Sequence, residues 1–360
     1  MALEIIGYVS HTRHTDTSGL WWSAEFDPDY IALTAQAHEE AGFDAVLVGS
    51  DSWGPDSWQV AAHVLRSTRK LKVLVAHRPG FVQPTVAARQ AITLQRLFGP
   101  RVALHIITGS AGGELQRDGD TLDPALRYAR TDEYMALLKR LWSAIEPFDH
   151  SGEFYRFRQG FSAIRPEAPL RLSFAGSSPE ALRVGAKHAD LYMLWGEPLA
   201  GVAQVIDTVH ANASAAGTQS PRFSVSLRAV VGATEQAAWQ KAQGIYQRAA
   251  TELAKSREAP EALQQNAFGL ASEGAKRLDD YARDGDVQDE RLWLGFTRLV
   301  GRGGSTSALV GTAEQIAQAY RRYHALGARS LYLRGWDIAK DAREYGEELI
   351  PALRAAVSHS

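Results

Sequence analysis

Short apolar runs alternate with longer amphipathic segments along most of the 360 residues. The apolar runs are nearly continuous rather than strictly alternating, as is typical of parallel strands that are covered on both faces. Eight of them are predicted to be strands, at residues 4–10, 43–49, 71–76, 102–108, 170–175, 191–195, 223–231 and 330–335.

Helical periodicity occupies the intervals between these strands. Gly42 ends the first helical segment and Pro84 begins the third, as expected at helix boundaries. Strict alternation of strand and helix over eight repeats predicts an α/β protein with a (β/α)8 TIM barrel. A doubly wound open sheet is the alternative, but the first strand ends in "YVSHTRHT", which is not its usual glycine-rich turn. The predicted helices span residues 29–41, 56–69, 84–98, 124–145, 178–188, 198–215, 233–256, 313–327 and 338–357.

Two segments are longer than a minimal barrel requires. Residues 146–169, after the fourth strand, are aromatic and interrupted by glycine, which predicts a small hairpin. Residues 257–312, after the seventh strand, combine a polar helical stretch with the glycine-rich "VGRGGSTSALVG". Long connections inside a compact domain are usually functional. We therefore expect one domain over residues 1–360, with a mobile lid at 257–312.

Composition narrows the functional classes. A net charge of −2 and a pI near 6.6 give no electrostatic reason to expect a nucleic-acid or membrane partner. The chain has no cysteine, which excludes disulfides, thiolate nucleophiles and cysteine-ligated metals. The N-terminus lacks signal-peptide features, and no apolar stretch approaches the roughly 20 residues that span a bilayer. A cytoplasmic protein is therefore expected.

Candidate site residues follow from the predicted barrel, because chemistry in this fold takes place at the carboxyl ends of the strands. Cations and aromatic groups gather at these ends without matching carboxylates. The side chains concerned are His11, His77, Arg78, Trp195, Arg228, Arg334 and Trp336, together with the glycine- and serine-containing segments 108–110 and 176–178.

The segment "FAGSSPEAL" (174–182) resembles the start of a helix. Ser177 or Ser178 can cap the helix, Pro179 suits its first turn, and Glu180 can complete a capping box. A helix N-terminus after a barrel strand can bind phosphate, although an ordinary helix start explains the segment equally well. His11 and His14 lack a third ligand, and neither HExxH nor G-x-S-x-G occurs, so neither a metal site nor hydrolase chemistry is predicted.

Several longer motifs resemble the bacterial luciferase-like flavin monooxygenases, and among them the two-component alkanesulfonate monooxygenases most of all. The motifs occur in order between about Gly7 and Leu353. They are "RPGFVQPTVAARQAITLQRLFGPRVALHIITGS" (78–110), "RYARTDEY" (127–134), "FAGSSPEAL" (174–182), "DLYMLWGEP" (190–198) and "SALVGT" (307–312).

The resemblance implies a TIM barrel that binds FMN as FMNH2, which a separate NAD(P)H-dependent flavin reductase supplies. In such enzymes O2 and FMNH2 form a peroxyflavin that oxygenates a small organic anion. With an organosulfonate substrate the products are sulfite and an aldehyde. The resemblance also implies a homodimer or homotetramer.

Matching motifs assign roles to individual residues. His11 corresponds to a histidine at the end of the first strand, and Trp195 lies in the "WGEP" motif beside the substrate pocket. Ala76 and His77 correspond to positions beside the flavin ring, and Arg78 is expected to be a structural ion-pair partner. The resemblance implies that His105 and Thr108 make polar contacts to the flavin ring. It places Tyr128 on the ribityl and phosphate side, and Gly176, Ser177 and Ser178 in the phosphate-binding turn.

The residues that correspond to the substrate-binding part of the site depart from the family pattern. The family's Arg-Leu-His reads Ser226-Leu227-Arg228 here, and Trp336 replaces a tyrosine. Arg228 and Arg334 could still bind an oxyanion. The arginine of the lid corresponds to Arg302, with Arg298 as the alternative. Two other functions stay open: deazaflavin-dependent hydride transfer on the same fold, and non-catalytic flavin binding.

Overall fold

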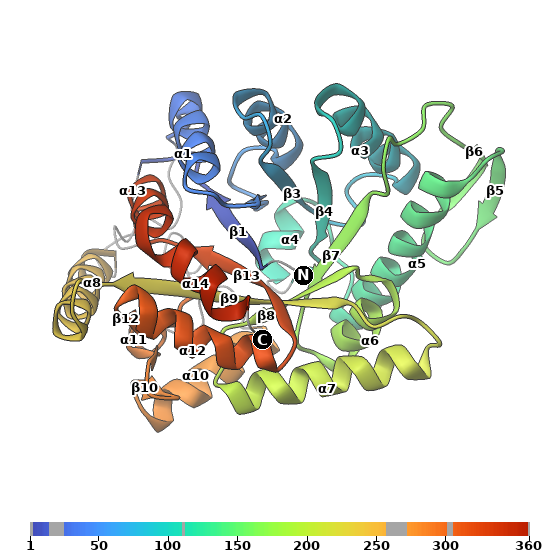
Figure 1. Ribbon diagram of the computed structural model, residues 1–360. Helices are drawn as coiled ribbons and strands as arrows, with labels where there is room; N and C mark the ends of the chain where they lie inside the picture. The colour runs from blue at the N-terminus through green and yellow to red at the C-terminus, as the bar shows by residue number, and fades with distance from the viewer. Residues whose placement is uncertain (1–2, 14–24, 110–111, 257–271, 301–304, 359–360) are drawn as a thin grey trace.

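Eight parallel strands form a closed barrel in the computed structural model, which describes residues 3–13, 25–109, 112–256, 272–300 and 305–358 (Figure 1). Neighbouring strands pair in chain order, and β9 pairs with both β8 and β13, which closes the sheet. The predicted (β/α)8 fold is therefore confirmed. The barrel strands are β1 (Glu4–Val9), β2 (Ala45–Val48), β3 (Lys72–His77), β4 (Val102–Ile106), β7 (Arg171–Ala175), β8 (Leu191–Trp195), β9 (Arg222–Val231) and β13 (Ala328–Arg334).

Helices surround the barrel, close to the predicted positions. The main ones are α1 (Pro28–Glu40), α2 (Ser57–Ser67), α3 (Pro84–Phe98), α5 (Pro124–Ser143), α6 (Pro179–His188), α7 (Leu199–Ala215), α8 (Glu235–Ser256) and α12 (Ala313–Ala325). The predicted final helix is interrupted: α13 (Ile338–Glu344) and α14 (Ile350–Val357) flank a π-helical turn, η1 (Tyr345–Leu349). In that turn a Cβ on Gly346 would lie only 2.6 Å from Ala41 Cα, so close packing against the end of α1 requires glycine.

The strands alternate between two apolar environments. Side chains such as Val73 and Val75 of β3 join the large core between strands and helices, whereas Leu74 lies in the separate cluster inside the barrel with Ile6 and Tyr332. Successive residues of a strand face opposite sides of the sheet. The positions of Val73, Leu74 and Val75 therefore fix which way the next residues of β3, including His77, point.

Both predicted insertions are present. The first, residues 146–169, contains a hairpin of β5 (Phe148–Ser151) and β6 (Arg156–Gly160), which confirms the predicted hairpin; it follows α4 (Gly112–Arg117) and α5. The second, residues 257–312, follows α8 and contains α10 (Glu273–Asp284), β10 (Val287–Gln288), β11 (Leu292–Trp293), α11 (Gly295–Val300) and β12 (Ala308–Gly311).

The end of the second insertion joins the barrel sheet. Strand β12 pairs in parallel with β9, with Ala308 opposite Arg228, and β11 pairs antiparallel to β12. Residues 257–271 and 301–304 of the predicted lid lie outside the described residues. Within the described ranges, no helix has the length and apolarity needed to span a membrane.

Candidate active site

The turn after β7 leads directly into the N-terminus of α6. Ser178 caps α6 by accepting a hydrogen bond from the Ala181 amide at 3.2 Å, and Pro179 begins the helix as predicted. Gly176 has a φ of +158°, and a Cβ there would lie 2.5 Å from Ala181 Cβ. The turn therefore needs glycine, and the backbone N–H groups of the α6 N-terminus are suited to a phosphate. Glu180 does not complete a capping box, because with Ser178 as the N-cap the third helical position is Ala181; the Glu180 carboxylate pairs with Arg183 at 3.0 Å.

Tyr128 of α5 completes this turn. Burial raises the pKa of its phenol, and a hydrogen bond with the Ser178 side chain opposes that rise. A Cβ on Gly176 would lie 3.6 Å from the Tyr128 hydroxyl oxygen. One turn later Asp132 accepts a hydrogen bond from Lys187 of α6 at 2.8 Å, which fixes this face of α5 against α6. Tyr128, Gly176 and Ser178 thus form one compact group.

His105 and Ala76 lie side by side on the inner face of the barrel. Their strands pair with Ala76 opposite His105, and His105 opposite Ser173. Ser173 Oγ donates to the Leu104 carbonyl at 3.3 Å and lies 3.0 Å from His105 Nδ1, so it accepts the Nδ1 proton. Burial lowers the pKa of His105 to about 4. The ring is therefore neutral at pH 7, with Nε2 unprotonated.

His77 faces the opposite way, into the layer of helices. The Trp58 indole N–H donates to His77 Nδ1 at 3.2 Å, and His77 Nε2 lies 2.7 Å from the Tyr134 hydroxyl. The Tyr134 hydroxyl in turn donates to the Val82 carbonyl at 3.0 Å. Burial lowers the pKa of His77 to about 4, and both of its ring nitrogens are engaged. His77 therefore holds α2, β3 and α5 together, and its expected proximity to the flavin ring stays a prediction.

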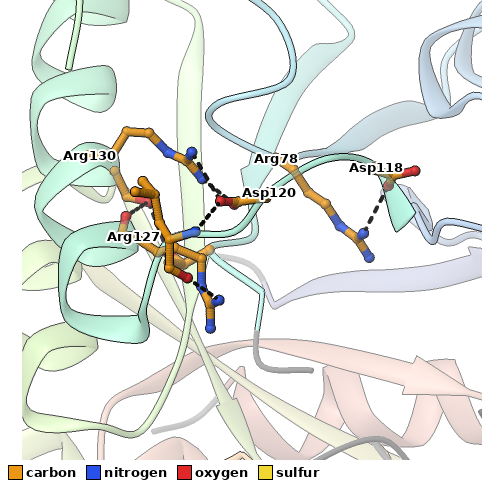
Figure 2. A network of polar contacts seen from close by, with 8 residues as sticks. Arg78, Asp118, Asp120, Arg127 and Arg130 are labelled. Carbon is orange, nitrogen blue, oxygen red and sulfur yellow. Dashed lines mark hydrogen bonds and ion pairs between the residues drawn. The ribbon is translucent and has the colours of Figure 1, made fainter. Parts of the chain in front are cut away.

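Arg78 lies at a polar pocket of about 450 Å³ between the ends of β2 and β3. Its guanidinium donates to the Ser50 carbonyl at 2.9 Å and lies 3.6 Å from Asp118 (Figure 2). The expected structural ion pair is therefore confirmed. The pocket is lined by Ala76 and His77 as well as by Asp51, Asp56 and Asp118.

Gly80 has a specific packing role in the turn after β3. Its φ is +104°, and a Cβ there would lie 2.4 Å from the Arg130 guanidinium carbon. Arg130 passes over this glycine to reach Asp120 at 2.5 Å, a pair that is almost fully buried. The turn is thus shaped to admit an arginine from α5.

His11 follows β1, and Arg334 ends β13 against the ring of Tyr8 in β1. Burial lowers the pKa of His11, although the charges of Asp51 and Glu25 oppose this shift, so the ring is mainly neutral at pH 7. The Arg334 guanidinium carbon lies 4.2 Å from the centre of the Tyr8 ring, a cation–π contact that holds the side chain at the end of β13.

Arg228 is more buried than its expected role implies. Its side chain is 3% exposed; Nε donates to the Ser305 carbonyl at 2.7 Å, and Nη1 donates to the Gly335 carbonyl at 2.6 Å. It also lies 4.4 Å above the Trp336 ring, which packs edge-on against Phe296 of α11. Arg228 therefore joins the second insertion to the end of β13, and Trp336 is part of that joint.

Trp195 lies directly below the second insertion. A Cβ on Gly274, in the first turn of α10, would lie 2.2 Å from Trp195 Nε1 and 2.7 Å from Ser177 Oγ. The next turn of α10 carries Arg277, which donates to both carboxylate oxygens of the buried Glu197, the closest at 2.6 Å. Helix α10 is thereby fastened over both Trp195 and Ser177.

Thr108 donates to Thr131 of α5 at 3.2 Å, so the end of β4 is also tied to α5.

Of the two candidate lid arginines, Arg298 is about half-exposed and pairs with Asp286 at 2.8 Å, and Arg302 lies outside the described residues. Sequence reasoning missed the Glu197–Arg277 pair, although Glu197 stands within the recognised "WGEP" motif.

The match to a known family agrees with this architecture. Residues 6–330 match the family model described as luciferase-like monooxygenase. The chain belongs to the luciferase-like monooxygenase family.

Solved structures of proteins with varied chemistry share the fold of this luciferase-like family member. EDTA monooxygenase from Chelativorans sp. BNC1 superposes with a TM-score of 0.78 at 16% identity, over 99% of this chain and 94% of the other. A long-chain alkane monooxygenase gives a TM-score of 0.75 at 17% identity, over 99% of this chain and 92% of the other. An F420-dependent secondary alcohol dehydrogenase gives a TM-score of 0.68 at 17% identity, over 98% of this chain and 99% of the other. At these identities the likeness establishes the fold alone.

Proposed function

We propose that this protein is an FMNH2- and O2-dependent monooxygenase of a small organic anion. The observation that carries the proposal is the phosphate-fitting group of Tyr128, Gly176 and Ser178, in a barrel of the luciferase-like monooxygenase family. Tyr128 and the turn at 176–178 would hold the flavin phosphate, and the inner face of the barrel at Ala76, His105 and Thr108 would face the flavin ring and ribityl chain. Bound FMNH2 supplies the electrons that activate O2.

The chain's own residues would orient the substrate and exclude water. His11, neutral at pH 7, can accept a proton at the barrel mouth. Arg334 carries a positive charge at the end of β13 that suits a sulfonate oxyanion. Trp195 forms one wall, and Arg228 with Trp336 sets the position of another. We include in the proposal that the insertion over 257–312 closes the site while substrate is bound.

An organosulfonate is the proposed substrate class. The overall reaction converts the sulfonate, O2 and FMNH2 to an aldehyde, sulfite, water and FMN. One oxygen atom enters the aldehyde and the other leaves as water. The FMNH2 would come from a separate NAD(P)H-dependent flavin reductase, and the enzyme would act as a homodimer or homotetramer.

The test is aerobic product analysis with an added flavin reductase across a panel of primary alkanesulfonates, whose sulfonate-bearing carbon can become an aldehyde. Sulfite and aldehyde should appear in equal amounts, and ¹⁸O₂ should label the aldehyde. Substrate-dependent O2 uptake with no sulfite from any sulfonate would reject the substrate class and leave the monooxygenase proposal standing. Absence of any substrate-dependent O2 uptake would reject both.

A second candidate is hydride transfer with a deazaflavin, and it is favoured by the F420-dependent enzyme that shares the fold. Binding measurements separate the two. FMN should bind at micromolar concentration under the first proposal, whereas binding of the deazaflavin without FMN would support the second.

A further inference from the structure

Ser226 and Ser305 form a hydroxyl pair at the carboxyl end of β9. Their Oγ atoms lie 2.9 Å apart, and either hydroxyl can be the donor. The next residue of the strand, Leu227, packs in the outer core between strands and helices. Since successive residues of a strand face opposite sides, Ser226 points into the barrel. It stands there beside Trp195, its partner in the paired register of β8 and β9.

Contacts with β9 fix the position of Ser305. Arg228 Nε donates to the Ser305 carbonyl at 2.7 Å, and the Arg228 amide donates to the Ser307 carbonyl at 2.9 Å. Strand β12, which follows directly, pairs with the same end of β9 (Figure 1). The second insertion thus presents one hydroxyl, that of Ser305, to the inward-facing Ser226.

The backbone of Ser305 is strained. Its φ is +43°, in the left-handed region that glycine adopts readily and other residues rarely do. The two preceding positions of the chain, 303 and 304, are both glycine, and yet position 305 is serine. A costly conformation that is kept for a polar side chain indicates a use for that side chain.

A second hydroxyl pair close by in the chain provides a comparison. Thr297 Oγ1 and Thr306 Oγ1 also lie 2.9 Å apart, but both residues are at most 1% exposed, so this pair joins α11 to the segment before β12 and nothing else can reach it. Ser226 is 9% exposed and Ser305 is more exposed than that. The serine pair is therefore open to a small molecule in the barrel mouth.

The chemistry of the serine pair favours a ligand group that both donates and accepts hydrogen bonds. Each hydroxyl has one donor hydrogen and two acceptor lone pairs. The hydrogen bond between the two uses one hydrogen and one lone pair, and leaves one hydrogen and three lone pairs. An oxyanion would meet mostly lone pairs here, whereas a hydroxyl group can accept from the one hydrogen and donate to a lone pair.

A cation stands a short distance above this pair. Tyr332 of β13 is opposite Ser226, and Arg334 is opposite Arg228. Arg334 is thus two residues further along the paired strands, which is about 7 Å towards the mouth. A sulfonate at Arg334 and a neutral group at Ser226 would then belong to one small molecule, a few bonds apart.

We propose that Ser226 and Ser305 form a subsite for a hydroxyl group of the substrate, and that the protein acts on sulfonates that carry such a group a few atoms from the sulfonate. This inference rests on the proposed function and narrows its substrate class. It explains why a strained serine is held against an inward-facing one at the end of β9.

The experiment is isothermal titration calorimetry of the full-length protein in the presence of oxidised FMN, so that no turnover occurs. The probes are ω-hydroxyalkane-1-sulfonates of about three to six carbons, which span roughly the separation of Arg334 and Ser226 along the strands. Each is compared with the alkane-1-sulfonate in which a methyl group replaces the hydroxyl. At one chain length or more, the hydroxyl compound should bind roughly 5- to 10-fold more tightly, and Ser226→Ala should reduce this preference to less than about twofold.

Ser305→Gly is the second variant, because it removes the other hydroxyl and relieves the left-handed strain. Relief of strain offsets the lost hydrogen bond, so the thermal midpoint should stay close to that of the wild type while the preference falls. Thr297→Val is the matched control, since it breaks an equivalent hydroxyl pair outside the barrel mouth. It should lower the thermal midpoint and leave the preference within about twofold of the wild type.

Equal affinities for the two members of every probe pair would overturn the inference, and so would a preference that survives both serine variants. The two proposals fail separately. Sulfite release from alkanesulfonates without any preference for the hydroxyl compounds would reject the subsite alone. A serine-dependent preference in a protein that takes up no O2 with any sulfonate would reject the proposed reaction and support the subsite.

Discussion

The two sides of the barrel mouth are held together by different interactions. On the phosphate side (β3, β4 and β7 with α5 and α6), neutral groups tie the strand ends to their neighbours, as His105 does with Ser173 and Thr108 with Thr131, and the buried ion pair of Arg130 with Asp120 joins residues only 10 apart in the chain. On the insertion side (β8, β9 and β13 with α10, α11 and β12), buried or half-buried arginines reach across the chain, as Arg228 does to Ser305 and Arg277 to Glu197.

This difference indicates which interactions determine the geometry of each side. The phosphate side is shaped by the barrel itself, because its residues stand at strand ends and at a helix start that the fold places automatically. The insertion side is assembled on the barrel by charged side chains, so its geometry depends on a few long-range contacts. Changes there should alter substrate turnover more than flavin binding.

Lowering the pH should destabilise the phosphate side more than the insertion side, and this is the largest difference that we expect. The pKa values of His77 and His105 are lowered to about 4 by burial, from 6.5. The unfolded chain therefore binds more protons between about pH 6.5 and 4, and the free energy of unfolding falls as pH falls through this window. The two groups together should cost several kcal/mol by pH 4.5, by linkage. The arginines of the insertion side keep their charge throughout.

Hydrogen exchange at pH 7 and pH 5 would measure this difference. Amides of β3 and β4 should lose protection at pH 5 relative to those of α10. In urea unfolding, His105→Asn should reduce the pH dependence of stability by about one proton. Equal loss of protection in α10 would contradict the proposed division.

Arg228→Met tests the insertion side. The substitution leaves the Ser305 and Gly335 carbonyls without their charged donor, and should cost about 2–4 kcal/mol of unfolding free energy. Turnover should fall by about tenfold or more, because Trp336 and the neighbouring insertion lose their common support. The affinity for FMN should change by less than about twofold, as a titration of flavin fluorescence would measure. A parallel loss of flavin affinity would show that the two sides are not independent.

Much of the fold could be predicted from sequence because its signals are local. Pro84 and the Ser178–Pro179 pair mark helix starts that the structure contains. The long helix expected over 338–357 is interrupted by η1, because Gly346 packs against Ala41, and this contact between distant parts of the chain leaves no trace in the helical periodicity.

The site was harder to predict, for two physical reasons. At a strand end, a shift of one residue reverses the direction of a side chain, so sequence alone could not show that His77 faces the helices and Ala76 the barrel interior. The partners of Arg228 lie 77 and 107 residues away, and no local pattern reveals them. Arginine is a residue type that suits an oxyanion, but the hydrogen bonds of Arg228 go to two backbone carbonyls.

Arg277→Met should have the smallest effect of the three changes. It leaves the Glu197 carboxylate, 2% exposed, without its cation, and because Arg277 itself is 30% exposed the cost should be about 1–3 kcal/mol. Limited proteolysis should then cleave within 257–312 faster than in the wild type, since α10 is no longer fastened over Trp195. FMNH2 with substrate should slow cleavage in the wild type more than in the variant.

Arg283→Met provides the matched control on the same helix. Arg283 is 64% exposed and pairs with Asp279 and Asp280 within one turn of the same helix, so its loss should cost at most about 0.5 kcal/mol and leave the cleavage rate unchanged. If both variants were cleaved at the same rate, the Arg277–Glu197 pair would contribute no more to holding α10 than a surface ion pair does. A faster rate in Arg277→Met alone would indicate that one buried carboxylate at the end of β8 holds the insertion over the site.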